Sequence, residues 1–118
     1  MEEIDRLVTS FGLPMGPFAL SDEVGLDVGV KVLRILNDGL GDRFKPADIF
    51  EKVFARGLLG KKTGKGFYCY GEFNEPNGEV TRILGQRAFL KFQKEDYLKR
   101  MIYIMVNEAA RCLGEGVV

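Results

Sequence analysis

The stretch YLKRMIYIMVNEAARCL, residues 97–113, decides the fold class of this chain. Its apolar side chains recur with the 3.6-residue period of an α-helix and form one stripe. At a rise of 1.5 Å per residue, such a helix is about 25 Å long, the width of a small domain. A helix this apolar on one face needs a partner surface, so we expect a helical bundle. The stripe consists of Leu98, Met101, Ile102, Met105, Val106, Ala109, Cys112 and Leu113.

Two shorter helices are predicted near the amino terminus. Residues 3–11 are amphipathic, and Gly12 is a typical residue for ending a helix. Pro17 suits the first position of the next helix, where a missing N–H costs nothing. That second helix is predicted to end at Gly25.

Two more helices are predicted before the chain becomes irregular. Asp27 is the expected N-cap of the third helix, which the Asn37–Gly41 segment closes. The fourth is expected to run from Pro46 to Gly57. Residues 58–78 lose the helical period, and helix resumes near Thr81. The whole pattern predicts an all-α bundle of about five helices.

Composition excludes several classes of protein. Seventeen basic residues balance 17 acidic ones in 118 residues, so no net field attracts nucleic acid or an anionic membrane. The chain has no histidine, the usual general base and the commonest metal ligand. Cys69 and Cys112 lack metal-ligand spacing and are expected to be reduced and buried. With no signal peptide or membrane-spanning run, we expect a cytoplasmic protein without a metal.

The basic loop at residues 60–66, GKKTGKG, is the strongest candidate for a ligand-binding motif. Its spacing does not match a phosphate-binding loop, which requires a glycine directly before the lysine and another five residues earlier. With the aromatic run at residues 67–70, Lys61, Lys62 and Lys65 could instead contact single-stranded nucleic acid. We favour a solvated loop whose aromatic side chains return to the core, and we expect no nucleic-acid partner.

The acidic residues form no evident catalytic pair. Asp22-Glu23 and Glu95-Asp96 are neighbours in sequence, and adjacent helical residues do not face each other. Glu108 is expected to pair with Arg111 three residues later.

Two strings carry a family resemblance. GLPMGPFALSD at residues 12–22, followed by GLD at 25–27, and LGKKTGKGFY at residues 59–68 occur in the expected order. Together they resemble the C-terminal domain of 3-hydroxyacyl-CoA dehydrogenases, over residues 1 to about 70. The resemblance implies the all-α architecture of the 6-phosphogluconate-dehydrogenase-like C-terminal domain.

The end of the chain resembles a different part of the same domain. NEAARCL at residues 107–113 is similar to its long first helix, which in the family precedes the segment at residues 3–5. The order implies two tandem copies, as in longer family members. Residues 1–93 would be the first copy without its first helix, and residues 94–118 the first helix of a second copy, packed on the first.

The resemblance also implies an activity for the longer polypeptide. Family members oxidise a 3-hydroxyacyl-CoA to the 3-ketoacyl-CoA with NAD, in fatty-acid β-oxidation. Their catalytic histidine lies in an upstream Rossmann domain that binds NAD, and an asparagine opens the first C-terminal helix. Here Lys99-Arg100 stands where that Asn-Arg pair would be, so no catalytic residue carries over. We expect the isolated chain to bind no cofactor and to be inactive.

Met15-Gly16-Pro17 is the candidate substrate-binding segment, as part of the wall of the acyl-CoA cleft. It carries no acid, base or strong donor side chain, so a turn that only packs is the alternative. The resemblance further implies a homodimer, a helix-swapped dimer or a pseudo-dimer. A non-catalytic all-α interaction module stays open, because fold alone does not determine function.

Overall fold

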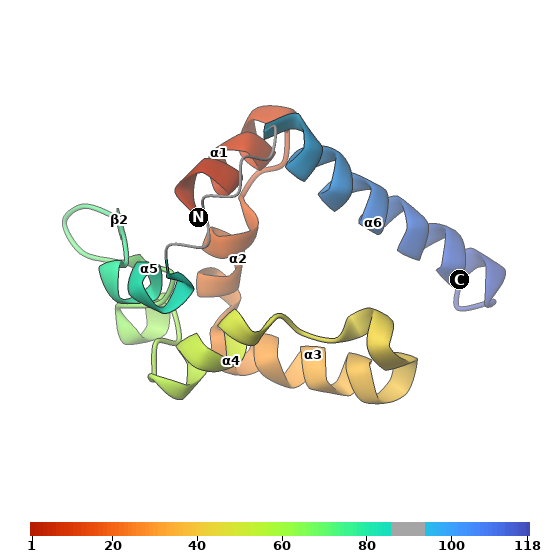
Figure 1. Cartoon of the computed structure of the whole chain (residues 1–118), viewed down its shortest axis with the longest axis horizontal. Coiled ribbons are helices and arrows are strands. Elements are labelled where there is room, and N and C mark those ends of the chain that lie inside the picture. Colours follow the sequence, from red (N-terminus) through yellow and green to blue (C-terminus); the bar gives the residue numbers. More distant parts are fainter. Residues whose placement is uncertain (86–93) are drawn as a thin grey trace.

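Helices make up most of the computed structural model, which describes residues 1–85 and 94–118 (Figure 1). The all-α prediction is confirmed, with six α-helices in these ranges where about five were expected. Within the described residues, the two-residue strands β1 (Tyr68–Cys69) and β2 (Glu75–Pro76) form one antiparallel pair. The helices are α1 (Glu2–Phe11), α2 (Pro17–Val24), α3 (Leu26–Leu40), α4 (Asp48–Ala55), α5 (Gly78–Leu84) and α6 (Lys94–Gly114), with short 3₁₀ helices η1 (Gly41–Phe44) and η2 (Lys61–Thr63).

The boundaries of the first two helices agree with the sequence. Gly12 follows α1 with a φ of 120°, a conformation that favours glycine. Pro17 is the first residue of α2, and Gly25 ends it. Proline and glycine are reliable markers here because each acts through its own backbone: proline fixes φ, and glycine adopts a positive φ without strain.

The start of the third helix was predicted wrongly. Asp27 is not its N-cap: α3 begins one residue earlier, at Leu26, whose amide donates to the carbonyl of Leu59 at 3.1 Å. Asp27 lies in the first turn, where its carboxylate pairs with the Lys62 ammonium. The Leu59 carbonyl thus satisfies the first of the amides that the helix itself leaves unpaired, and no side-chain cap is present.

Two other boundaries differ from the prediction. α3 continues through Asn37 and Gly39 as far as Leu40, and Gly41 follows it. α4 begins at Asp48 rather than at Pro46, because η1 and a short extended segment occupy residues 41–47.

A small apolar core is centred on Phe67, which is fully buried at 0% exposure. The ring of Phe18 meets it edge-on with centroids 4.9 Å apart, and the ring of Phe50 does so at 5.7 Å. Edge-to-face pairs add to the free energy gained by burial. The segment after α4 therefore returns an aromatic side chain to the core, as expected. The buried core residues are Leu26, Val53, Leu58, Phe67 and Val80.

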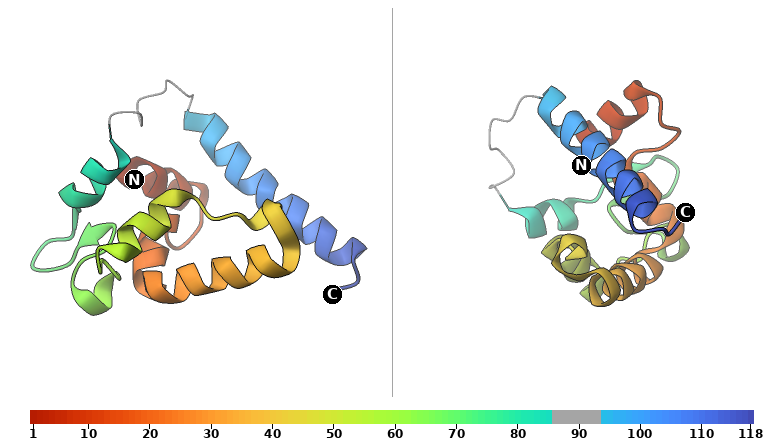
Figure 2. Two further views of the ribbon diagram at one scale, coloured as in Figure 1. Left: turned by 60° about the horizontal axis from the view of Figure 1, so that its bottom comes forward. Right: turned by 90° about the vertical axis from the view of Figure 1, so that its right-hand side faces the viewer.

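Helix α6 extends away from this core as an arm (Figure 1). It packs on α1 near its beginning and then runs towards the end of α3, as Figure 2 shows. Near its far end, Glu115 accepts from the Arg43 guanidinium at 3.1 Å. Part of the apolar stripe lies half-buried, whereas Met105 is 58% and Leu113 70% exposed.

Candidate functional site

The segment Met15-Gly16-Pro17 forms the tight turn that enters α2. Gly16 is the N-cap, in extended conformation, and Pro17 occupies the first helical position. A Cβ at position 16 would lie 2.3 Å from the Cα of Asp5, closer than atoms can approach. The glycine is therefore required by the packing of α1 against this turn.

The Asp5 carboxylate caps α2 from outside the helix. It is 8% exposed, and its two oxygens accept from the amides of Phe18 and Ala19, each at 2.9 Å. The hydroxyl of Tyr68 donates to the same carboxylate at 2.8 Å. Because a helix N-terminus favours negative charge, Asp5 stabilises the start of α2. Its position also means that this N-terminus already holds an anion and is not free for a ligand phosphate.

The Asp22 carboxylate likewise accepts hydrogen bonds from backbone amides, here those of the segment that enters β1. It is 1% exposed and accepts from the amides of Phe67 and Tyr68, each at 2.8 Å. The hydroxyl of Tyr70 donates to it at 2.9 Å. A buried carboxylate with three donors has its charge compensated by hydrogen bonds. Asp22 thus fastens the second sequence string to α2, which contains the end of the first.

Burial raises the pKa of the Tyr68 and Tyr70 hydroxyls, and donation to Asp5 and Asp22 raises the pKa of each further. A folded-state pKa above the unfolded value means that the stabilisation is complete below the ordinary tyrosine pKa of about 10 and is lost as pH rises above it. We expect Tyr68 and Tyr70 to ionise above the ordinary tyrosine pKa in the native chain. Tyrosinate absorbance against pH measures this. Ionisation of either residue at the ordinary tyrosine pKa while the chain remains folded would contradict it.

A cavity of about 420 Å³ lies between α1, the Met15-Gly16 turn and the β1–β2 hairpin. Met15 and Gly16 line it, whereas Pro17 does not. The volume is in the range of small-molecule sites. Its wall combines apolar surface with tyrosine hydroxyls, and its charged pair Arg6–Glu2 is joined at 3.0 Å. The lining residues are Glu2, Asp5, Arg6, Thr9, Pro14, Met15, Gly16, Ala19, Tyr68, Tyr70 and Asn74.

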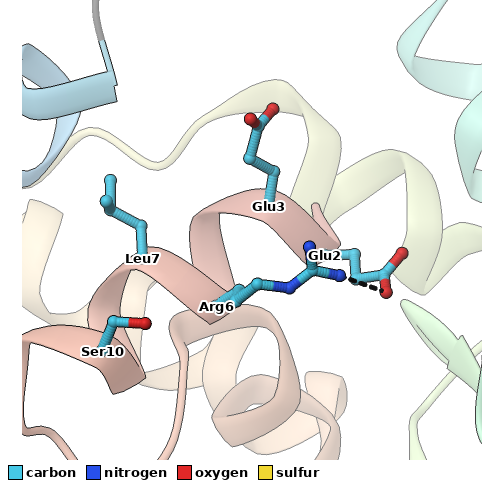
Figure 3. Close-up of a pocket in the computed structure, with 5 residues that line it drawn as sticks. All are labelled: Glu2, Glu3, Arg6, Leu7 and Ser10. Carbon is cyan, nitrogen blue, oxygen red and sulfur yellow. Dashed lines mark hydrogen bonds and ion pairs between the residues drawn. The ribbon is translucent and has the colours of Figure 1, made fainter.

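Two other hollows lie elsewhere on the chain. One, of about 440 Å³, separates α6 from η1 and the start of α4 and includes Arg43, Phe50 and Ile104. The other, of about 270 Å³, is lined by five residues of α1, which Figure 3 shows with the ion pair between Arg6 and Glu2 marked.

The sequence of the chain matches a known protein family. Residues 1–70 match the family described as 3-hydroxyacyl-CoA dehydrogenase, C-terminal domain. The chain belongs to this family.

Similar proteins agree with this assignment. The chain is 41% identical over its whole length to the fatty acid oxidation complex subunit alpha of Vibrio campbellii, and 40% to that of Shewanella halifaxensis. It spans 17% of the length of these relatives. The crystal structure of the dehydrogenase part of multifunctional enzyme 1 from C. elegans superposes with a TM-score of 0.74, at 31% identity, and covers 100% of this chain and 27% of that one. The (S)-3-hydroxybutyryl-CoA dehydrogenase of Ralstonia eutropha matches 60% of the chain and 26% of its own, with a TM-score of 0.56 and 38% identity.

Membership of the 3-hydroxyacyl-CoA dehydrogenase family raises the question of NAD. Dinucleotides bind at the carboxyl edge of a parallel sheet, next to a glycine-rich turn and a helix. Residues 1–85 and 94–118 contain only the antiparallel β1–β2 pair, so they do not fit NAD. In the same ranges, no group of three or more potential metal ligands occurs, and no helix is long and apolar enough to cross a membrane.

The lysines of residues 60–66 are partly engaged by acidic neighbours. Lys61 pairs with Glu23 at 2.5 Å, and Lys62 pairs with Asp27. The Thr63 hydroxyl closes the loop by donating to backbone carbonyls. Two of the three lysines thus have carboxylate partners within the chain.

Three further predictions from the sequence concern Glu108, the two cysteines and the Lys99-Arg100 pair. Glu108 pairs with Arg111 at 3.8 Å, as expected, and also with Arg43 at 3.7 Å. Cys69 and Cys112 are free but only half-buried, where full burial was expected, because the hairpin and α6 lie at the surface. Lys99-Arg100 lies exposed on α6, away from the cavity beside Met15.

Sequence reasoning missed Asp5 and did not predict the buried role of Asp22. The available signal was chemical: an acidic residue on the amphipathic α1, and an aspartate inside the first string, each amid apolar neighbours. Neither could be assigned a partner, because their donors lie 13 to 63 residues away in the chain.

Proposed function

We propose that this chain is part of an NAD-dependent 3-hydroxyacyl-CoA dehydrogenase that acts in fatty-acid β-oxidation. The longer polypeptide would oxidise a 3-hydroxyacyl-CoA to the 3-ketoacyl-CoA, with NAD held by an upstream Rossmann domain. The observation that carries the proposal is the family match over residues 1–70, together with relatives that are similar along the entire chain. A cytoplasmic location is part of the same proposal.

Within that enzyme, we propose that the Met15-Gly16-Pro17 turn forms part of the wall of the acyl-CoA cleft. Support comes from the cavity beside Met15 and Gly16, whose wall is mostly apolar and in which the charged residues Arg6 and Glu2 are paired with each other. Such a wall suits an acyl thioester, which is uncharged at its reacting end. The Asp5 and Asp22 carboxylates are occupied by backbone and tyrosine donors, so neither serves as a general base here.

We further propose that residues 94–118 are the first helix of a second domain copy and that residues 1–93 are the first copy without its own first helix. The exposed apolar residues of α6 support a role in assembly, as a dimer or pseudo-dimer contact. The same exposure supports the alternative of a non-catalytic interaction module. If the chain is part of the enzyme, it supports turnover within the longer polypeptide; if it is a non-catalytic interaction module, it does not.

One experiment tests the enzymatic role. The chain is substituted for the 119 aligned residues of the Vibrio campbellii subunit, which is 41% identical to it. We expect the chimera to form NADH from a 3-hydroxyacyl-CoA, and the 118-residue chain alone to form none. A subunit lacking the segment is the control and should be inactive. A folded chimera without turnover favours the interaction module, and turnover by the isolated chain contradicts its predicted inactivity.

A further inference from the structure

The start of α2 is held by groups that lie outside the Met15-Gly16-Pro17 turn. Pro17 has no N–H, so the first two amides of α2 that can donate belong to Phe18 and Ala19. Both donate to Asp5, each to a different oxygen. One carboxylate of α1 therefore joins the start of α2 to α1, beside the close packing of Gly16 on Asp5.

Tyr68 connects this arrangement to the hairpin. Its hydroxyl donates to Asp5 at 2.8 Å, while its backbone amide donates to Asp22, also at 2.8 Å. One residue thus spans the two buried carboxylates. The cavity beside Met15 has the turn on one side and the hairpin on the other, and the hydrogen bond between Tyr68 and Asp5 joins these two sides.

We propose that Asp5 and Tyr68 are positioning residues that set the Met15-Gly16-Pro17 turn against the hairpin, a role that rests on the proposed function of the turn in the substrate cleft. Asp5 acts through the backbone of α2 and Tyr68 acts through Asp5. Neither exchanges a proton with substrate. Because a cleft wall contacts the ground state and the transition state alike, loosening it weakens substrate binding more than it slows the chemical step.

The Tyr68→Phe variant of the chimera tests this proposal, since it removes one hydroxyl and keeps the ring. We expect the KM for the acyl-CoA to rise about three- to tenfold with kcat within about twofold. Asp5→Asn should raise KM further, because an amide cannot accept from both backbone donors and from Tyr68 at once. Asp5→Glu, which keeps the charge, should recover part of the loss.

A matched control separates positioning from general destabilisation. Val53→Ala creates a cavity in the core, where Val53 is fully buried, and its apolar side chain takes part in none of the hydrogen bonds of the turn or the hairpin. It should lower the melting temperature while leaving KM unchanged. A KM for Tyr68→Phe within twofold of the parent chimera, or a rise matched by Val53→Ala, overturns the proposal.

A second measurement does not depend on turnover. In the 118-residue chain, the amides of Phe18 and Ala19 should exchange with deuterium about tenfold faster in Tyr68→Phe than in the parent, while the amides within α3 are unaffected. A chimera that folds but is inactive would overturn the proposed function and leave this readout intact. Unchanged exchange at both amides would overturn the positioning role itself.

Discussion

Replacing Gly66 with alanine is expected to lower the free energy of unfolding by about 3 kcal/mol or more. An alanine Cβ there would lie 2.1 Å from Oδ1 of Asp22 and 2.6 Å from the Cα of Gly60. The Gly60 contact is backbone and cannot rotate away. Asp22 is held by three hydrogen bonds, so any movement that relieves the clash breaks bonds to a buried carboxylate. Hydrogen bonds to charged groups are among the costliest to lose.

The measurement is equilibrium unfolding in denaturant or by heat, where a loss of this size lowers the melting temperature by about 10–20 °C. Gly71→Ala is the matched control, because nothing lies within 4 Å of the Cβ it would add. That variant should stay close to the parent in stability. Equal melting temperatures for Gly66→Ala and the parent would mean that the contact between the hairpin and Asp22 does not form in solution.

The parts of this fold that could be predicted from sequence are those set by local backbone chemistry. Pro17, Gly12 and Gly25 marked helix ends correctly, because each acts through its own φ angle. The long period of residues 97–113 predicted α6, which extends from Lys94 to Gly114. Tertiary contacts rarely override an apolar period that is repeated over about five helical turns.

What could not be predicted depends on contacts between distant residues. At the start of α3, the amide of Leu26 donates to the carbonyl of Leu59, which lies 33 residues further along the chain. The sequence around Asp27 does not indicate this contact. The same holds at the candidate site. Met15 and Gly16 were identified through family resemblance, whereas the cavity beside them exists because α1 and the hairpin meet there. The glycines at positions 16 and 66 are needed for space rather than for backbone freedom, and space is a property of the folded chain.

Replacing Met105 with glutamate is expected to break the association that we propose for α6. Met105 is 58% exposed within the chain, and Val106 and Leu113 of the same apolar stripe are 58% and 70% exposed. If a second chain or domain covers this surface, the substitution buries a carboxylate without a partner, at a cost of several kcal/mol. The molar mass from light scattering should fall to that of one chain, or the chain should lose its cooperative unfolding transition.

The control lies on the opposite side of the same helix. Arg100→Glu introduces the same side chain five residues earlier, about 140° round the axis from Met105. Arg100 is exposed, so this variant should keep the mass and melting temperature of the parent. The two outcomes follow from geometry, since only the Met105 side of α6 continues the apolar stripe. If Met105→Glu keeps the parent's melting temperature and its mass in solution, α6 is a solvated arm and the proposed contact is wrong. If both variants dissociate, charge on the helix as a whole, rather than burial of the stripe, controls the association.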